Sequence, residues 1–150
     1  MQWWGLAKKD EPLGIPVENS EFVDKFTTTF IDKITEIKKK LKIDNPIVIV
    51  GKDCPRKNIW RYDLMDSYKE SRDKDDGFQG GPFFKMAYDS LFEEAGVNSI
   101  VAYPRLEADD CVALTVERIK ESVENANIWI ITSDMDYLQL ADKNVHIYNL

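Results

Sequence analysis

The sequence predicts an α/β fold with a largely parallel central sheet and helices on both of its faces. Two observations support this prediction. Segments with helical periodicity alternate with short apolar runs along the 150 residues, as expected of parallel strands joined by right-handed helical crossovers. The run Ile47-Val48-Ile49-Val50 is also uninterrupted and β-branched, which is typical of a strand buried on both faces.

The first half of the chain is predicted to contain a loop, a helix and a strand. Residues 1–19 show no apolar periodicity and are predicted to form the loop. Across residues 20–42, apolar side chains recur every three or four positions, which predicts an amphipathic helix. Lysines in its last turn favour the helix dipole, and Pro46 breaks the helix before the strand at residues 47–50.

The second half continues the alternation. Residues 51–81 are polar and mixed in charge, and Pro82 is placed to begin a helix that ends at Gly96. The other predicted elements are a strand near residues 99–103, a helix over 108–123, a strand over 128–132, a short helix over 135–141 and a last strand over 145–148.

The composition excludes several classes of protein. A hydrophobic fraction of 43% excludes a wholly disordered chain, and no apolar run is long enough to cross a membrane. The start of the sequence lacks a secretory signal, and Cys54 and Cys111 lack metal-type spacing. We therefore expect reduced thiols and an intracellular location, in a bacterium, an infected cell or a nucleus. A single histidine, His146, argues against His-based zinc sites and against Ser-His or Cys-His catalysis.

Acidic residues follow three of the predicted strands. Because sites in open parallel sheets form at the carboxyl ends of strands, we expect these side chains to converge. Carboxylates without His or Cys favour Mg²⁺ or Mn²⁺, and two such ions can hold the attacking and leaving oxygens of a phosphoryl transfer. The candidate metal ligands are Asp53, Glu107, Asp109, Asp110, Asp134 and Asp136.

Each acidic cluster also has a plainer interpretation. Asp53 alone is typical of a loop, and the acids near residue 107 would also stabilise the start of a helix. Asp134 and Asp136 would also serve as an N-cap and a first-turn acid. The coincidence of all three clusters at strand ends favours a shared site.

A second feature is a locally basic segment in an acidic chain of net charge -7. Residues 52–72 hold six bases against four acids, interleaved with Trp60, Tyr62 and Tyr68, a pattern that suits a phosphate backbone and stacked bases. The alternative is an ordinary exposed amphipathic segment. Lys69 and Arg72 would share one helix face and together hold a phosphate. The candidate DNA-binding residues are Arg56, Lys57, Arg61 and Tyr68.

The net negative charge first argues against a nucleic-acid partner, because phosphate binding usually leaves a basic footprint. Most of the charge comes from residues 103–142, which hold nine acids and three bases. At least five of these acids are candidate metal ligands. The acidity therefore indicates a cation site next to a basic segment rather than repulsion of DNA.

Two acidic motifs resemble those of the 5′-nuclease family, which includes flap endonucleases, phage 5′-3′ exonucleases and the 5′-nuclease domain of bacterial DNA polymerase I. Glu107-Ala108-Asp109-Asp110 is followed about 25 residues later by the second motif, residues 131–140. Trp60-Arg61 and residues 68–72 resemble the segment that enters the helical arch of the family, and residues 47–53 resemble its second strand.

The resemblance implies a PIN-like core that hydrolyses DNA in replication or repair with two Mg²⁺ ions, for which Mn²⁺ can substitute. The implied substrates are DNA with 5′ ends, flaps or nicks. The six carboxylates would hold the metal ions, with Asp53 as the sixth by position. Lys69 and Arg72 would act in catalysis by contacting the scissile phosphate.

The sequence departs from the family pattern at both ends. The family begins with a strand that delivers an Asp to the site, and continues into a helix-hairpin-helix element with one more metal-site Asp. Neither is evident in residues 1–150, which we therefore expect to form a single but partial core. Further segments or a partner chain would complete it.

Two other functions remain open at this point. One is a nuclease-like module that recognises branched DNA without cutting, or that cuts only with a partner. The other is a phosphatase of the haloacid dehalogenase type, because Asp134-Met135-Asp136 after a strand resembles the motif of that family. Those enzymes usually carry Thr or Val four residues after the first Asp, where this chain has Leu138.

Overall fold

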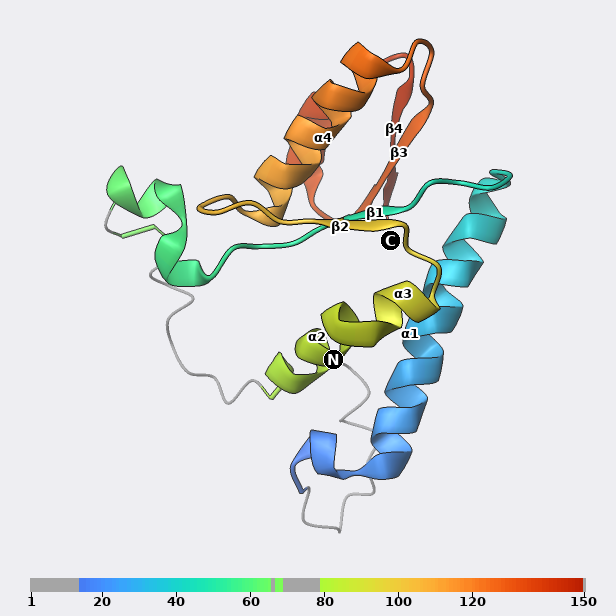
Figure 1. Cartoon of the computed structure of the whole chain (residues 1–150), viewed down its shortest axis with the longest axis vertical. Helices are drawn as coiled ribbons and strands as arrows, with labels where there is room; N and C mark the ends of the chain where they lie inside the picture. Colours follow the sequence, from blue (N-terminus) through green and yellow to red (C-terminus); the bar gives the residue numbers. More distant parts are fainter. Residues whose placement is uncertain (1–13, 66, 69–78, 150) are drawn as a thin grey trace. The chain divides into compact units, whose positions relative to one another are not determined.

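The structure is a computed structural model that describes residues 14–65, 67–68 and 79–149 (Figure 1). By its contacts the chain divides into two compact units. The first comprises residues 1–48 and 71–98, and the second comprises residues 49–70 and 99–150. Every described strand belongs to the second unit. The single core predicted for residues 1–150 stays a prediction.

The first unit begins with a 3-10 turn, η2 (Pro16–Glu18), followed by the long helix α1 (Ser20–Leu41). The Asn19 side chain caps α1 by accepting a hydrogen bond from the Phe22 N–H at 3.0 Å. The helix ends where Lys42 adopts a left-handed conformation, with φ 52°. The predicted helix is confirmed, whereas the predicted loop before it contains the turn η2.

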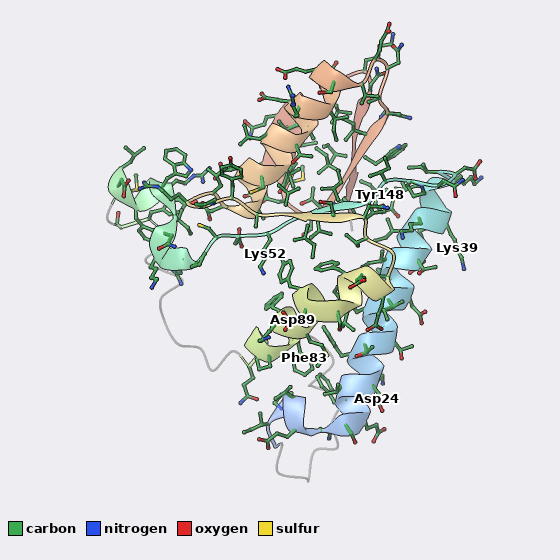
Figure 2. All side chains as sticks on the ribbon, in the orientation of Figure 1. Asp24, Lys39, Lys52, Phe83, Asp89 and Tyr148 are labelled. Atoms are coloured by element: carbon green, nitrogen blue, oxygen red, sulfur yellow. The ribbon has the colours of Figure 1, made fainter. Side chains whose placement is uncertain are left out.

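A second helical segment completes this unit. It consists of α2 (Gly81–Met86), the π-helical turn η6 (Ala87–Leu91) and α3 (Phe92–Glu94), and it confirms the helix predicted from Pro82. Phe83, labelled in Figure 2, is only 1% exposed and packs on Phe22 and Phe26 of α1. The core of the first unit is therefore aromatic.

The second unit contains two pairs of parallel strands. β1 (Ile49–Gly51) pairs with β2 (Ser99–Val101), and β3 (Ile128–Thr132) pairs with β4 (Val145–Asn149). The predicted parallel arrangement is confirmed, but the described residues form two separate pairs instead of one continuous sheet. β1 also begins two residues later than predicted, because Ile47 is 79% exposed and lies outside the pairing.

Helix α4 (Ala108–Ser122) packs on strands from both pairs (Figure 1). Its Val116 forms a core cluster with Ile130 of β3 and Val145 of β4. Near its start it lies so close to β1 that a Cβ on Gly51 would meet the Ala108 carbonyl oxygen at 2.9 Å. Glycine at position 51 is therefore what allows the start of α4 to approach the end of β1.

Three short 3-10 helices lie in the described part of the second unit. They are η3 (Arg56–Asn58), η4 (Trp60–Asp63) and η7 (Met135–Leu140). The last confirms the short helix predicted after β3, while η3 and η4 lie in the segment for which the sequence predicted no regular element. No helix in the described part of the chain is long and apolar enough to cross a bilayer.

Candidate functional site

The candidate site is built around the first turn of α4. Glu107 is the N-cap of this helix, and Glu107 and Asp110 form a capping box in which the Asp110 Oδ2 accepts the Glu107 N–H at 3.1 Å. Acidic side chains are favourable here because the helix dipole is positive at its N-terminus. The plainer interpretation of these two acids as helix-start residues is therefore correct for their backbone contacts.

The guanidinium of Arg61 joins the side chains of these two acids. Its Nη1 donates to Glu107 Oε2 at 2.8 Å and to Asp110 Oδ2 at 2.7 Å, and its Nη2 donates to Asp110 Oδ1 at 2.7 Å. The Trp60 Nε1 donates to Asp110 Oδ2 at 3.2 Å, and the Tyr68 hydroxyl donates to Glu107 Oε2 at 2.7 Å. We call Trp60, Arg61, Tyr68, Glu107 and Asp110 the Arg61 cluster.

Backbone hydrogen bonds bring the two sides of the Arg61 cluster together. The Cys54 N–H donates to the Leu106 carbonyl at 2.9 Å, and the Trp60 N–H donates to the Arg105 carbonyl at 3.0 Å. The segment after β1 thus runs alongside the segment before α4. The turn η4 then presents Arg61 to the first turn of the helix.

The ionisation of the Arg61 cluster follows from these contacts. Hydrogen bonding to Asp110 raises the pKa of Arg61 above its usual value, although burial acts in the opposite direction. The same hydrogen bond lowers the pKa of Asp110, and the Glu107 N–H and the Trp60 side chain lower it further. Both partners are therefore charged at neutral pH.

The other four candidate ligands behave differently. Asp53, Asp109, Asp134 and Asp136 are all exposed, and the part of the chain that the structure describes contains no ion pair to any of them. We call them the exposed carboxylates. Asp53 Oδ1 accepts the Ala108 N–H at 2.6 Å, which ties the end of β1 to the start of α4.

Two further contacts fix the exposed carboxylates. The Tyr137 hydroxyl of η7 donates to Asp109 Oδ1 at 2.8 Å. Asp134 is the N-cap of η7, and its Oδ1 accepts the Asp136 N–H at 2.9 Å. The predicted N-cap is therefore present at Asp134, and the same turn carries the tyrosine that reaches Asp109.

The Tyr137 hydroxyl lies within electrostatic reach of acids that follow three different strands. Burial raises the pKa of its hydroxyl above the usual value, the hydrogen bond to Asp109 raises it further, and the charges of Asp109, Asp134 and Asp53 add to the effect. These acids follow β2, β3 and β1 respectively. Their negative charges act on a single hydroxyl, as expected if the carboxyl ends of the strands meet.

The donor set fits a hard divalent cation by its chemistry. The exposed carboxylates supply only oxygen atoms, and their negative charges repel one another without a counterion. Among the described residues, no three acidic, His or Cys side chains are grouped closely enough to hold an ion. The acids therefore share a region of the second unit without forming a closed coordination shell.

The predicted DNA-binding residues lie in different surroundings. Arg56 and Lys57 are exposed on η3, and the Arg56 Nε donates to the Tyr62 hydroxyl at 3.1 Å. Arg61 and Tyr68 contact Glu107, as described above, and their role in DNA binding stays a prediction. Lys69 and Arg72, predicted to contact phosphate, lie outside the described residues.

Neither the contact of Tyr137 with Asp109 nor the pairing of Arg61 with acids was predicted from the sequence. The available signal for Tyr137 is its place directly after Asp136, on the turn that Asp134 caps. No local signal exists for the Arg61 pairing, because its partners lie 46 and 49 positions away.

The fold has a counterpart among solved structures. It is similar to the T5 5′-exonuclease in a structure with bound divalent metal ions (zinc), with a TM-score of 0.56 and 19% sequence identity. The match covers 83% of this chain and 47% of that chain. The class of the fold is therefore the PIN-like α/β fold of that protein, which confirms the predicted fold class.

The sequence defines the family more closely. Residues 16–150 match the family model described as 5′-3′ exonuclease, N-terminal resolvase-like domain, and the chain belongs to this family. The predicted resemblance to the 5′-nuclease family is confirmed. The family match supports a nuclease instead of a phosphatase of the haloacid dehalogenase type.

Two relatives illustrate the similarity. A 5′-3′ exonuclease of Mycoplasmopsis pulmonis is 34% identical over 131 residues, and flap endonuclease Xni of Colwellia psychrerythraea is 31% identical over 90 residues. The matches cover 85% and 60% of this chain but 41% and 29% of the relatives. The chain thus spans less than half the length of these relatives.

Proposed function

We propose that this chain carries the metal-binding core of a 5′-3′ exonuclease or flap endonuclease that hydrolyses DNA phosphodiester bonds. The observation that carries the proposal is that the acid-bearing segments after β1 and β3 are both tied to the start of α4, through the Asp53–Ala108 and Asp109–Tyr137 hydrogen bonds. The family of the chain supports the same activity. The proposed substrates are DNA with 5′ ends, flaps or nicks, formed in replication or repair.

The proposed cofactor is a pair of Mg²⁺ ions, for which Mn²⁺ can substitute. When bound, the ions supply charge stabilisation for in-line displacement at phosphorus. The exposed carboxylates would bind the metal, with Glu107 and Asp110 of the Arg61 cluster next to them. The hydrogen bonds from Ala108 and Tyr137 orient Asp53 and Asp109 for that role.

DNA binding is proposed for the basic residues near the site. Arg56 and Lys57 are exposed on η3, where they can contact a phosphate backbone. Lys69 and Arg72 are proposed to hold the scissile phosphate, as members of the segment that resembles the entrance to the arch of the family. Such contacts would align the phosphodiester bond with the carboxylates.

The direct test is cleavage of a 5′-labelled flap or nicked duplex by the full chain, with Mg²⁺, Mn²⁺ or EDTA. The proposal predicts cutting that requires a divalent ion, and loss of cutting with retained DNA binding in Asp134→Asn. Asp24→Asn, an exposed substitution on α1, is the matched control and should cut like the wild type. DNA binding with no metal-dependent cutting would contradict the enzymatic proposal for this chain.

A second candidate function is DNA recognition that needs another polypeptide for cutting. The observation that favours it is the exposure of Arg56 and Lys57 on η3, which suits DNA binding and does not depend on a metal ion. Adding to the same assay the part of the Mycoplasmopsis pulmonis exonuclease that this chain does not match separates the two functions. Cutting that begins only after this addition would support the partner-dependent module.

A further inference from the structure

An open hollow of about 640 Å³ lies where the segments that follow β1 and β2 run together. A backbone hydrogen bond from the Lys52 N–H to the Val101 carbonyl, 2.9 Å long, joins the two segments at the ends of the strands. The hollow is within the size range of small-molecule sites. The lining residues that matter here are Lys52, Asp53, Asn58, Tyr103 and Pro104.

Tyr103 supplies the aromatic wall of this hollow, and it is 65% exposed. The same side chain lines a second hollow of about 350 Å³, which lies against apolar residues of α4 such as Leu114 and Ile119. A single exposed aromatic residue is ordinary on a protein surface. Tyr103 differs from that case because it borders two hollows, one of which contains the exposed carboxylate Asp53.

The backbone that carries Tyr103 is held in one conformation. The Leu106 N–H donates to the Tyr103 carbonyl at 3.2 Å and closes a turn with Pro104 in second place. Arg105 in third place has φ 73°, where a turn of this kind usually has glycine. A non-glycine residue in this conformation persists only where its surroundings fix it.

Contacts with η4 fix this turn. The Arg105 carbonyl accepts the Trp60 N–H at 3.0 Å, and the Arg105 side chain is ion-paired to Asp63. Tyr103 is therefore placed next to Asp53 before any ligand binds. A ligand that contacts a pre-positioned ring loses less free energy to ordering of the protein.

The charge of the hollow suits a neutral, planar ligand. Its charged lining residues are one base, Lys52, and one acid, Asp53, so it lacks the excess of positive charge that a phosphate requires. A nucleobase is uncharged, and every base has a face that stacks on an aromatic ring. The Asn58 side chain supplies a donor and an acceptor for the edge of a base.

We propose that Tyr103 stacks on a base of the DNA substrate and thereby places the adjoining phosphodiester bond at the exposed carboxylates. This inference rests on the proposed function and names the part of the substrate that the site binds. Because Asp53 lines the same hollow, a base on Tyr103 brings its own phosphate next to a proposed metal ligand. Tyr103 is thus a binding residue that orients the substrate.

The test measures binding and cutting of one 5′-labelled flap duplex by the full chain. Affinity is measured in EDTA, and single-turnover cutting is measured with Mg²⁺. In a series of substrates, each nucleotide near the cut is replaced in turn by an abasic one, which removes the base and keeps the backbone. The variants are Tyr103→Ala, Tyr103→Phe and the control Leu114→Ala, whose side chain is 54% exposed on α4.

The proposal expects a loss that depends on one base. Tyr103→Ala should bind the intact substrate about tenfold more weakly than the wild type, whereas Tyr103→Phe keeps the ring and should bind normally. Leu114→Ala should be unchanged. One abasic position should weaken wild-type binding by the same factor, and with that substrate the wild type and Tyr103→Ala should bind equally. Cutting rates at low enzyme concentration should follow the same pattern.

A second measurement covers the case in which Tyr103→Ala does not fold. The substrate then carries a fluorescent adenine analogue at the position that the abasic series identifies. Its fluorescence should fall on binding to the wild type, because stacking quenches it, and should fall less with Tyr103→Leu. The melting temperature of each variant shows whether it is folded, and little change is expected for so exposed a side chain.

Two results would overturn the stacking role. One is equal binding of the intact substrate by Tyr103→Ala and the wild type. The other is a defect of Tyr103→Ala that persists unchanged on every abasic substrate, since Tyr103 would then act on the protein and not on a base. If the wild type binds the flap but no divalent ion supports cutting, the proposed nuclease function fails, and the affinity series in EDTA still decides whether Tyr103 stacks on a base.

Discussion

The Arg61 cluster and the exposed carboxylates contain the same kind of side chain in different surroundings. The carboxylates of the cluster are ion-paired to an arginine, whereas the exposed carboxylates have no ion pair among the described residues. Asp109 and Asp110 are neighbours in sequence, yet Asp110 binds a guanidinium, whereas Asp109 accepts a hydrogen bond from the Tyr137 hydroxyl. Successive helix residues point about 100° apart, so two adjacent acids at a helix start face different surroundings. The comparison indicates that two neighbouring acids of one helix turn can have different partners, one a guanidinium and the other a hydroxyl.

The largest effect on the rate of DNA cutting is expected for a substitution among the exposed carboxylates. Asp109→Asn should reduce metal-dependent cutting about 100-fold or more, because it removes a charge that the proposed metal ions require. Its melting temperature should stay near that of the wild type, since Asp109 is exposed and has no ion pair in the described part of the chain. Single-turnover rates on a flap substrate and thermal unfolding measure the two effects.

The control for Asp109→Asn is Asp89→Asn, which removes an exposed acid from η6 in the first unit. It should leave the cutting rate unchanged. An Asp109→Asn variant that cuts at the wild-type rate would exclude Asp109 from the metal site and would remove the distinction between the two groups.

Asp110→Asn should show the reverse pattern, with a loss of stability and a smaller change in Mn²⁺ affinity. The variant keeps the Arg61 charge but weakens its ion pair, which should cost about 1–3 kcal/mol of unfolding free energy in this partly exposed site. Urea unfolding measures the loss, with Asp109→Asn as the matched neighbour. Equal stability of the two variants would show that the Arg61–Asp110 pair contributes nothing.

The contribution of Asp110 should also depend on pH. Because its pKa is lowered in the folded chain by Arg61, its stabilising effect is present above its usual value of 3.8 and is lost as the pH falls through the lower folded value. The stability difference between wild type and Asp110→Asn should therefore shrink below about pH 4. A difference that grows in acid would contradict the ion pair as its source.

Much of this arrangement follows from sequence, for identifiable reasons. Apolar periodicity is a local property, and it correctly predicted α1, α4 and the runs that form β1 to β4. The positions of the acids directly after the strands could also be predicted, because they too are a local property of the sequence. Strand pairing is not local, and the two separate strand pairs were not predicted.

The partners of Arg61 could not be predicted from the sequence. A guanidinium suits a DNA phosphate and a carboxylate equally well, so its residue type does not decide its partner. Its basic neighbours Arg56 and Lys57 pointed to DNA, whereas the fold brings Glu107 within 2.8 Å. Backbone contacts between distant segments, such as that of Trp60 with Arg105, bring that partner within reach.

Gly51→Ala tests whether the Arg61 cluster and the exposed carboxylates both depend on the close approach of β1 to α4. The new Cβ would lie 2.9 Å from the Ala108 carbonyl oxygen and from Val112 Cγ2, so β1 or the first turn of α4 must shift. We expect a loss of about 1–3 kcal/mol in urea unfolding, together with weaker Mn²⁺ binding. Gly14→Ala, whose Cβ would meet no atom of the described residues within 4 Å, should change neither measurement.

If Gly51→Ala lowers stability but leaves Mn²⁺ affinity intact, the metal-binding arrangement does not depend on the close approach. The two groups would then be independent, although Glu107 and Asp53 both contact the same helix turn. The Arg61 cluster and the exposed carboxylates would then respond separately to changes in the start of α4.

Tyr137→Phe should produce the smallest effect. It removes a single hydroxyl, and its hydrogen-bond partner Asp109 is exposed to water. The lost hydrogen bond should cost about 1 kcal/mol or less of stability. Phe keeps the packing of the ring against the core cluster, so any change in Mn²⁺ affinity reports the orientation of Asp109. We expect a reduction of a few-fold, since water can replace the hydroxyl as donor but does not hold the carboxylate in one rotamer. Tyr148→Phe on β4 is the matched control, and an equal reduction in both variants would show that Tyr137 has no specific part in orienting Asp109.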